Sequence, residues 1–333
     1  MRYSVGVDIG GTNIKLALCD KKARLRGKRT FSTTGFKDRS ALIDGIVSRI
    51  EELISGAGLK KREIIGVGIG APGAVDIRTG TVHYLTNIPD WREVPLGNTL
   101  KKRLGIPVFV DNDVNVMALG EVYFGAGKGA VNMLCITLGT GVGGGLILDG
   151  KLYRGSSYAA GEFGHIPINI DGPKCKCGSW ACVEAYAGNS YIVKDVIARI
   201  RSGQKTLITK LVEGDLSKVT PEIISEAARK NDKFAKQVWI DVGQMIGIGL
   251  AGVVNLLNVE KIVIGGGVAG AGKRLFDSIK KAIKLRAMKL PAKTVKIVKA
   301  KLGYDAGLIG AATLVLYELH HTPWRTPRGN SLA

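Results

Sequence analysis

The chain has 333 residues, of which 45% are hydrophobic and 23% charged. This is the balance of a globular protein with room for two domains. Lys and Arg (48) outnumber Asp and Glu (28), which gives a net charge of +20. A net positive charge of this size is typical of proteins that bind nucleic acid, and it can also attract an anionic substrate such as a nucleotide. Because the cations are scattered and only 6% of residues are aromatic, we favour a solvated surface or nucleotide steering and predict no nucleic-acid partner.

The five cysteines indicate a reducing compartment. Three of them lie between residues 175 and 182, while Cys19 and Cys135 are isolated in apolar runs. That is a poor disulfide framework and favours the cytosol. The N-terminus lacks the apolar core of a signal peptide, and no run of about 18 apolar residues appears. We therefore expect a cytoplasmic protein without a membrane partner.

The first part of the chain reads as an α/β unit. Residues 3–9 form an apolar strand, and a glycine turn leads into a second strand that ends near residue 20. Residues 40–54 have the apolar spacing of a helix. Buried strands follow at residues 64–69 and 107–111, and the second of them leads into a helix that an Asn or Asp can cap. We place the small domain at residues 1–115.

The pattern then repeats. Residues 131–150 again read as strand, glycine turn and strand, which suggests two related domains that face each other across a cleft. Helices dominate residues 188–256, and residues 261–267 form a further strand and glycine turn. We place the large domain at residues 116–304. An apolar helix at residues 305–319 should pack back on the small domain, and residues 320–333 should form a flexible tail.

Three glycine-rich turns come after predicted strands. Glycine lets backbone N–H groups approach an anion closely, and Thr and Asn add donors. The candidate nucleotide-binding residues are Asp8, Gly10, Gly11, Thr12, Asn13 and Lys15; Gly139, Thr140, Gly141 and Gly143; and Gly265, Gly266 and Gly267. We assign the apolar third turn to the adenosine and the other two to phosphates. Asp8 can hold the Mg²⁺ of a nucleotide through water.

A run of polar residues, Asp111-Asn112-Asp113, separates a buried strand from a helix. On spacing alone, Asp113 is equally a helix N-cap or a functional carboxylate stabilised by the helix dipole. Its neighbour Asn112, and the two acids Glu162 and Glu184 of the segment 161–184 described below, favour the functional interpretation. A carboxylate that accepts the proton of an attacking hydroxyl is the usual base in phosphoryl transfer.

The densest cluster of reactive side chains lies between residues 161 and 184. His165, Cys175, Cys177 and Cys182 form a complete Cys3His set, which can close a tetrahedral structural zinc site. Two carboxylates, Glu162 and Glu184, bracket this set, and a purely structural zinc module does not need them. We interpret the segment as a metal-braced scaffold that binds a ligand with hydroxyl groups.

The order and spacing of these motifs resemble the ROK family of repressors, open reading frames and sugar kinases, over the chain up to about residue 319. The resemblance implies an α/β, two-domain actin-like/hexokinase ATPase fold (ribonuclease H-like) with an active-site cleft between the lobes. It implies phosphorylation of a hexose by ATP with Mg²⁺, most simply glucose to glucose 6-phosphate. Asp113 would be the base, and a structural Zn²⁺ would bind His165, Cys175, Cys177 and Cys182. The residues of the sugar pocket would be Gly73, Thr86, Asn87, Asn112, Asp113, Glu162, His165 and Glu184.

Ala181 departs from the family pattern, which usually has glycine before the last zinc cysteine. The added methyl group matters if this residue needs a positive φ. Within the same family, an N-acetylglucosamine or N-acetylmannosamine kinase is the alternative. A repressor would need a helix-turn-helix domain before the first phosphate loop, and a catalytically inactive sensor should lack Asp113, Thr12 or Thr140. The family also leads us to expect a homo-oligomer, a dimer or a tetramer.

Overall fold

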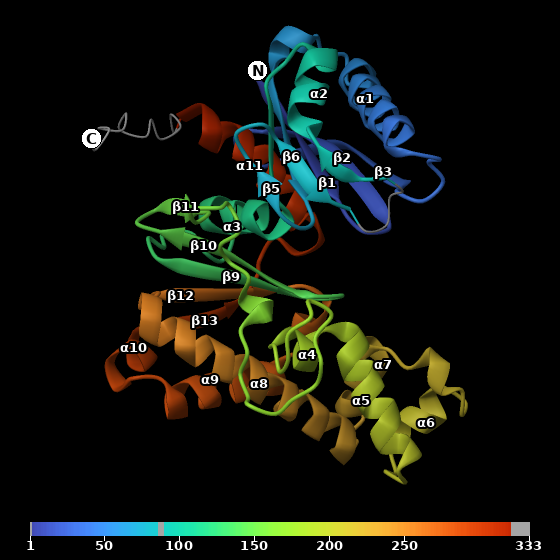
Figure 1. Cartoon of the computed structure of the whole chain (residues 1–333), viewed down its shortest axis with the longest axis vertical. Coiled ribbons are helices and arrows are strands. Elements are labelled where there is room, and N and C mark those ends of the chain that lie inside the picture. Colours follow the sequence, from blue (N-terminus) through green and yellow to red (C-terminus); the bar gives the residue numbers. More distant parts are fainter. Residues whose placement is uncertain (1, 86–89, 321–333) are drawn as a thin grey trace, which may run out of the picture. The chain divides into compact units, whose positions relative to one another are not determined.

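The computed structural model describes residues 2–85 and 90–320, which form two compact units (Figure 1). Unit 1 contains the chain up to Gly120 and from Tyr304 onwards, and unit 2 runs from Glu121 to Gly303. The boundary therefore lies five residues later than the predicted one at residue 115. Thr86, Asn87 and the predicted tail beyond His320 lie outside the described residues.

The main sheet of unit 1 has the strand order β3-β2-β1-β4-β8. β1, β2 and β3 are antiparallel neighbours, whereas β4 runs parallel to β1 and β8 parallel to β4. The strands are β1 (Tyr3–Ile9), β2 (Asn13–Asp20), β3 (Leu25–Ser32), β4 (Ile64–Ala71) and β8 (Val108–Asn112). A small antiparallel sheet is formed by β5 (Val75–Asp76), β6 (Thr81–Tyr84) and β7 (Arg92–Val94).

The helices of unit 1 are α1 (Arg39–Gly56), α2 (Leu96–Leu104), α3 (Asp113–Phe124, whose last turn enters unit 2) and α11 (Ala306–His320). Asp38 caps α1 by accepting a hydrogen bond from the backbone N–H of Ala41 at 2.9 Å. α11 packs against β1 and β4, as Figure 1 shows. Gly6 and Gly68 make this close packing possible, since a Cβ atom at either position would overlap a backbone carbonyl of α11.

The sheet of unit 2 has the order β11-β10-β9-β12-β13. β9, β10 and β11 are antiparallel neighbours, and β12 and β13 add parallel strands on the other side of β9. The strands are β9 (Met133–Leu138), β10 (Val142–Leu148), β11 (Lys151–Tyr153), β12 (Lys261–Gly265) and β13 (Lys296–Lys299). The strand order and the pairing directions are the same as in the main sheet of unit 1. The repeat seen in the sequence is therefore a repeat of one sheet topology.

The helices of unit 2 are α4 (Glu184–Ala187), α5 (Asn189–Arg201), α6 (Leu207–Leu211), α7 (Pro221–Arg229), α8 (Lys233–Leu257), α9 (Lys273–Arg286) and α10 (Lys289–Thr294). Among the described residues, α8 alone is long and apolar enough to cross a membrane by length and composition. It packs against α9, α7, α4 and α10 and contributes Trp239, Ile246 and Leu250 to the core of unit 2. The central helix of a folded core passes the same composition test.

A buried carboxylate ties together the two places where the chain passes between the units. Glu121, in the last turns of α3, is fully buried. Its carboxylate accepts hydrogen bonds from the backbone N–H groups of Ala126 (2.6 Å), Lys301 (3.0 Å) and Leu302 (2.9 Å). The segment that leads out of α3 and the segment that leads into α11 are thus joined within unit 2. No local pattern in the sequence indicated this contact.

Candidate functional site

The first of the three glycine-rich turns joins β1 to β2 in unit 1. The backbone N–H of Gly10 donates to the carbonyl of Asn13 at 2.9 Å, which closes the turn. Thr33 holds the turn from the side, since its N–H donates to the carbonyl of Thr12 (2.8 Å) and its hydroxyl to that of Gly11 (3.0 Å). The side chains of Thr12 and Asn13 are exposed. The turn therefore presents polar groups to solvent on a fixed backbone.

An acidic side chain lies beneath this turn. Asp8 pairs with Lys15 in the register of β1 and β2, and its carboxylate lies 3.6 Å from the Lys15 ammonium. Burial raises the pKa of Asp8, and the charge of Lys15 partly counteracts that shift. The start of α11 comes close because Gly307 has no side chain, and a Cβ atom there would lie 2.6 Å from the carboxylate. A partly desolvated carboxylate of this kind is suited to a cation.

The predicted base lies where β8 ends and α3 begins. Asn112 caps α3, since its Oδ1 accepts from the N–H groups of Val114 (2.9 Å) and Asn115 (3.2 Å). Its Nδ2 donates to the carbonyl of Gly73 at 3.1 Å, and Gly73 has a positive φ of 81°, which glycine adopts without strain. Asp113 Oδ1 also accepts from the Val114 N–H at 2.9 Å, but the bond to the Asn115 N–H is made by Asn112, so α3 does not depend on Asp113 alone for its cap.

Two buried residues support this turn from behind. Asp111 and Asn115 are 1% and 2% exposed. Asp111 Oδ1 accepts from the backbone N–H of Asn112 at 2.7 Å and from Asn115 Nδ2 at 2.8 Å. Asp111 belongs to the polar run in the sequence, but no role was predicted for it. The sequence feature that could have indicated this role is the spacing of Asp111 and Asn115, an acid and an amide four residues apart at a strand–helix junction.

Unit 2 contains the other two glycine turns, and it brings them together. The turn from Gly139 to Gly141 joins β9 to β10, and its Gly139 carbonyl accepts from the N–H of Asn189 at 2.9 Å. Gly266 comes after β12 with a φ of 85°, and a Cβ atom there would overlap the carbonyl of Leu138. Gly143, by contrast, lies inside β10, paired with Thr137. The second and third turns therefore form one surface, while the first belongs to unit 1.

Glu184 connects the second turn to the cysteine cluster. Its Oε2 accepts from the backbone N–H of Val142 at 2.9 Å, and its Oε1 lies 3.9 Å from the sulfur of Cys175. Gly141 must lack a side chain here, because a Cβ atom would lie 2.6 Å from the Glu184 carboxylate. Glu184 is also the first residue of α4, a favourable position for a negative charge. One carboxylate thus fixes the turn relative to the cluster.

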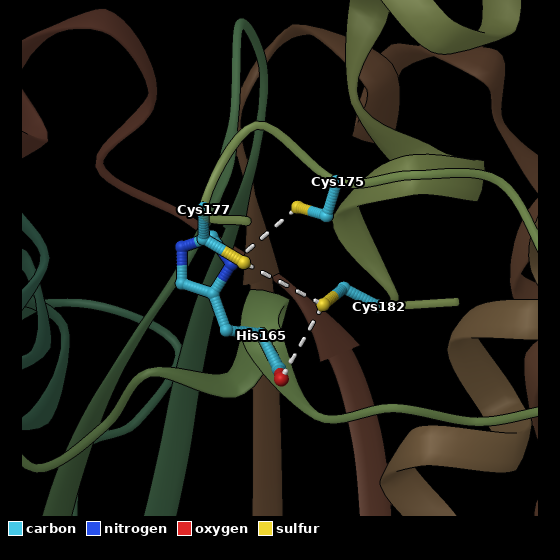
Figure 2. A group of neighbouring side chains, drawn as sticks. All are labelled: His165, Cys175, Cys177 and Cys182. Carbon is cyan, nitrogen blue, oxygen red and sulfur yellow. Dashed lines mark hydrogen bonds between the residues drawn. The ribbon is translucent and has the colours of Figure 1, made fainter. Parts of the chain in front are cut away.

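The four predicted metal ligands converge on one point (Figure 2). One donor atom from each of His165, Cys175, Cys177 and Cys182 lies within 4.8 Å of all the others. The sulfurs of Cys177 and Cys182 are 3.8 Å apart, and Cys175 Sγ lies 3.8 Å from His165 Nδ1. A tetrahedral zinc ion with Zn–S bonds of about 2.3 Å sets its sulfur ligands about 3.8 Å apart. The residues therefore fit the group that the donor set suggests.

Two of the thiols have contrasting environments. Burial raises the pKa of Cys182 to about 12, so a neutral thiol would stand there at neutral pH unless a metal displaced its proton. The backbone N–H of Ser179 lowers the pKa of the exposed Cys177. Ala181, just before Cys182, is fully buried and has a φ of 53°. Ala181 therefore has the left-handed backbone conformation that the glycine usual at this position would adopt without strain.

His165 presents its two ring nitrogens to different neighbours. Nδ1 faces Cys175, whereas Nε2 lies 3.9 Å from the carboxylate of Glu162. Both His165 and Glu162 belong to the short segment at the helical turn from Phe163 to His165. The side chain of Glu162 is 56% exposed, so it faces solvent beside the candidate metal ligands. This arrangement allows one imidazole to bind a metal and orient a carboxylate.

The predicted residues are therefore distributed over both units. Asp8, the first turn, Gly73, Asn112 and Asp113 belong to unit 1; Glu162, His165, Glu184, the cysteines and the other two turns belong to unit 2. The glycine turns and Asn112 lie at the ends of strands, whereas Glu162, His165 and the cysteines lie in the connection between β11 and α5. Thr86 and Asn87 lie outside the described residues.

Known proteins are similar to this chain over nearly its whole length. Residues 4–318 match the sequence model of the ROK family. The glucokinase of Halalkalibacterium halodurans is 37% identical over 94% of this chain and 95% of its own length. A ROK family glucokinase from Streptomyces griseus, solved with glucose and AMPPNP, is 37% identical, with a TM-score of 0.78 over 94% of this chain and 98% of that one.

A transcriptional regulator, a homologue of the Escherichia coli MLC protein, is 28% identical, with a TM-score of 0.84. It covers 94% of this chain but only 77% of its own length is matched. The predicted α/β fold of the hexokinase type is confirmed by these structures. Because the match to the family spans nearly all of the chain, the protein belongs to the ROK family.

Proposed function

We propose that the protein is an ATP-dependent hexose kinase that converts glucose to glucose 6-phosphate. The observation that carries this proposal is the identity of 37%, over 94% of the chain, with a structure that holds glucose and an ATP analogue. The curated glucokinase of Halalkalibacterium halodurans is equally similar. The two glycine turns that come after β1 and β9 supply the polar groups and fixed backbone that phosphates require.

The reaction would centre on Asp113. Its carboxylate would accept the proton of the 6-hydroxyl while that oxygen bonds to the γ-phosphorus of ATP, and ADP leaves with the electrons of the broken P–O bond. Asp111 and Asn115 would hold the turn that carries Asp113. Asp8 and the turn at Gly10 would position the phosphates, and Mg²⁺ would offset their charge when bound. Alignment of hydroxyl and phosphorus would supply much of the rate.

The sugar hydroxyls would bind Glu162, His165 and Glu184, together with Asn112 and the loop at Gly73. A structural Zn²⁺ on His165, Cys175, Cys177 and Cys182 would brace this wall of the pocket. Its geometric support is the convergence of the four donor atoms. The orientation of His165, with Nε2 toward Glu162, supports the idea that the metal positions the carboxylate rather than reacting itself.

The substrate assignment is tested by a coupled assay with ATP on a panel of sugars. Glucose should give the highest kcat/KM. If N-acetylglucosamine or N-acetylmannosamine is preferred instead, the protein is the hexosamine kinase of the same family. If no sugar in the panel is phosphorylated by ATP, the kinase proposal fails, and a sugar-sensing regulator becomes the better explanation.

The role of Asp113 is tested by Asp113→Asn. Loss of a general base costs a factor of about 10² to 10⁴ in rate, so kcat should fall by at least a hundredfold while glucose binding, measured by calorimetry, survives. Asp44→Asn is the matched control, because Asp44 is a surface carboxylate in α1 that pairs with Arg103. Near-normal turnover by the Asp113 variant would remove Asp113 from the base role.

This function would place the protein in carbohydrate metabolism, at the entry of glucose into glycolysis, and in the cytoplasm, where ATP is available. The expected homo-oligomer rests on the family resemblance and is measured by light scattering.

A further inference from the structure

Half of the net positive charge of the protein lies in one short stretch of unit 2. Residues 273–301 contain eleven Lys and Arg and a single acid, a balance of +10 out of the +20 of the whole chain. The cations are Lys273, Arg274, Lys280, Lys281, Lys284, Arg286, Lys289, Lys293, Lys296, Lys299 and Lys301. The expectation that the cations are scattered along the chain therefore missed this concentration.

These cations are exposed and mostly unpaired. All eleven residues are exposed to solvent. Over the described ranges, a salt bridge joins only Lys273 of the eleven to an acid, Asp277. The backbone N–H groups of Val131 and Asn132 lower the pKa of Glu260, and the charges of Lys261 and Lys296 add to that shift. The remaining positive charges repel one another, and this repulsion destabilises the folded protein. A surface without a binding partner gives no reason for it.

Large aliphatic side chains project from the same surface. Leu285, Met288 and Leu290 are 73%, 69% and 74% exposed, and Leu256 is 83% exposed. They lie where α8 and α9 end and α10 begins. The backbone N–H of Met288 donates to Asn255 Oδ1 at 2.8 Å, which joins the start of α10 to the last turn of α8. α10 packs against both longer helices (Figure 1).

The local fold explains why these side chains face outward. α9 buries Leu275, Ile279 and Ile283 on one side, and α8 packs against that helix. The opposite side of the helix carries Lys280, Lys281 and Lys284. Leu285 comes two residues after the buried Ile283, and half a turn of helix separates their directions. It is therefore exposed although it is apolar.

Protection of a sheet edge accounts for only part of the pattern. β13 is the last strand of its sheet, and lysines such as Lys296 and Lys299 commonly prevent edge-to-edge pairing. That reason does not extend to the lysines of α9 and α10. It also does not explain why exposed leucines and a methionine lie among them.

We propose that the α9–α10 surface, defined as residues 280–293 together with Leu256, binds a lipid bilayer that carries anionic headgroups. Cations near such a bilayer are attracted to its phosphates, and aliphatic tips insert into the headgroup region. Nucleic acid would use the cations but not the aliphatic tips, and residues 277–303 contain no aromatic side chain for stacking on bases. This surface revises the expectation of a protein without a membrane partner, and it does not depend on the proposed kinase activity.

The experiment is co-sedimentation of the full chain with vesicles of phosphatidylglycerol and phosphatidylcholine, against vesicles of phosphatidylcholine alone. Binding should require phosphatidylglycerol and should be lost in about 0.5 M salt, where charges are screened within about 4 Å. The quadruple change Lys281→Gln, Lys284→Gln, Lys289→Gln and Lys293→Gln should weaken binding at least tenfold, since each cation near a bilayer contributes about fivefold. The control Lys60→Gln, Lys101→Gln, Lys205→Gln and Lys210→Gln changes the net charge equally and should bind as the natural protein does.

A second variant separates lipid from other polyanions. Leu285→Gln with Met288→Gln and Leu290→Gln keeps every charge and should weaken vesicle binding while leaving any affinity for a DNA or RNA oligonucleotide unchanged. Unchanged unfolding temperatures and kinase activity would show that these surface variants are folded. The proposal is overturned if the natural protein does not bind the anionic vesicles, if both quadruple variants lose binding equally, or if the aliphatic variant binds vesicles normally.

Discussion

The two sheets of the molecule share one strand order and one set of pairing directions, yet they differ in the connection after the third strand. In unit 1 a short connection, residues 33–38, leads from β3 to α1. In unit 2 the corresponding connection, residues 154–188, leads from β11 past the cysteine cluster and α4 to α5. The repeated topology fixes where the glycine turns lie. The cysteine cluster lies in a connection between elements, where extra residues do not disturb the pairing of the strands.

The two units also differ in the side chains that support their connections. Thr33, in the short connection, braces the first phosphate turn with two hydrogen bonds. In the long connection, Glu184 binds the second turn through Val142. The long connection has little regular structure between Tyr153 and Glu184, so we expect the metal to supply the stability that secondary structure does not.

The largest effect should come from removing the metal, and it should be confined to unit 2. Cys177→Ser should abolish bound zinc by elemental analysis and lower the unfolding temperature by about 10 °C or more. Hydrogen exchange should accelerate in residues 162–188 but not in the sheet of unit 1. Cys19→Ala, which changes a cysteine outside the cluster, should keep the zinc. Equal zinc content in both variants would contradict the prediction that the metal binds the cysteine cluster of unit 2.

A smaller effect should come from the glycines that let helices pack closely. Gly68 lies in β4, where a methyl group would overlap the carbonyl of Ala311, so Gly68→Ala should cost about 3 kcal/mol, at the upper end of the usual cost of overpacking. Gly247 lies in α8 against Ala282 and Ile279. Gly247→Ala should cost less, because alanine gains about 1 kcal/mol of helix propensity. Urea denaturation checks the order, and a larger loss for Gly247→Ala would show that α11 can shift on its sheet.

The third prediction uses equivalent positions in the two sheets. Asp8 precedes the last residue of β1, and Thr137 precedes the last residue of β9. Because burial raises the pKa of Asp8, its unfolded state loses its proton at a lower pH than its folded state. Stability should therefore fall as the pH rises from the usual Asp pKa through the raised one, and the loss should persist above it.

Asp8→Asn should remove this pH-dependent loss, so the variant should be more stable than the natural protein at neutral pH and lose that advantage in acid. Turnover with ATP should fall at least about tenfold, as the proposed role of Asp8 in holding the Mg²⁺ of the nucleotide requires. Thr137→Ser is the control and should leave the pH profile of unfolding unchanged. A neutral-pH stability of Asp8→Asn below that of the natural protein would show that Lys15 more than offsets the burial.

The smallest effect should come from Ala181→Gly. The left-handed backbone of Ala181 costs a non-glycine residue about 1–2 kcal/mol, whereas the buried methyl group contributes about 0.8 kcal/mol. The variant should therefore gain about 0.5 kcal/mol and keep its zinc. Thermal unfolding of the zinc-bound protein measures this difference. A loss of stability would mean that packing of the methyl group outweighs the strained φ.

Much of the candidate site was predictable because its signals are local. The four candidate metal ligands and the three glycine turns lie in short segments, and each segment has a recognisable spacing. Asp111 and Glu121 were missed for opposite reasons. Asp111 stood in the polar run but its burial could not be seen, and Glu121 binds residues far along the chain, at Lys301 and Leu302.

The sequence by itself determined the family and the α/β repeat and picked out the four side chains that the structure gathers into a candidate metal site, because periodicity, turn chemistry and ligand spacing are properties of neighbouring residues. Only the tertiary structure decided that Asn112 bonds to the N–H groups of Val114 and Asn115 at the start of α3, that Ala181 has a positive φ, and that Gly266 lies against Leu138. It also gathered the aliphatic tips of α8, α9 and α10 among unpaired lysines. Each of these depends on contacts between segments that are distant in sequence or on backbone angles that composition does not reveal.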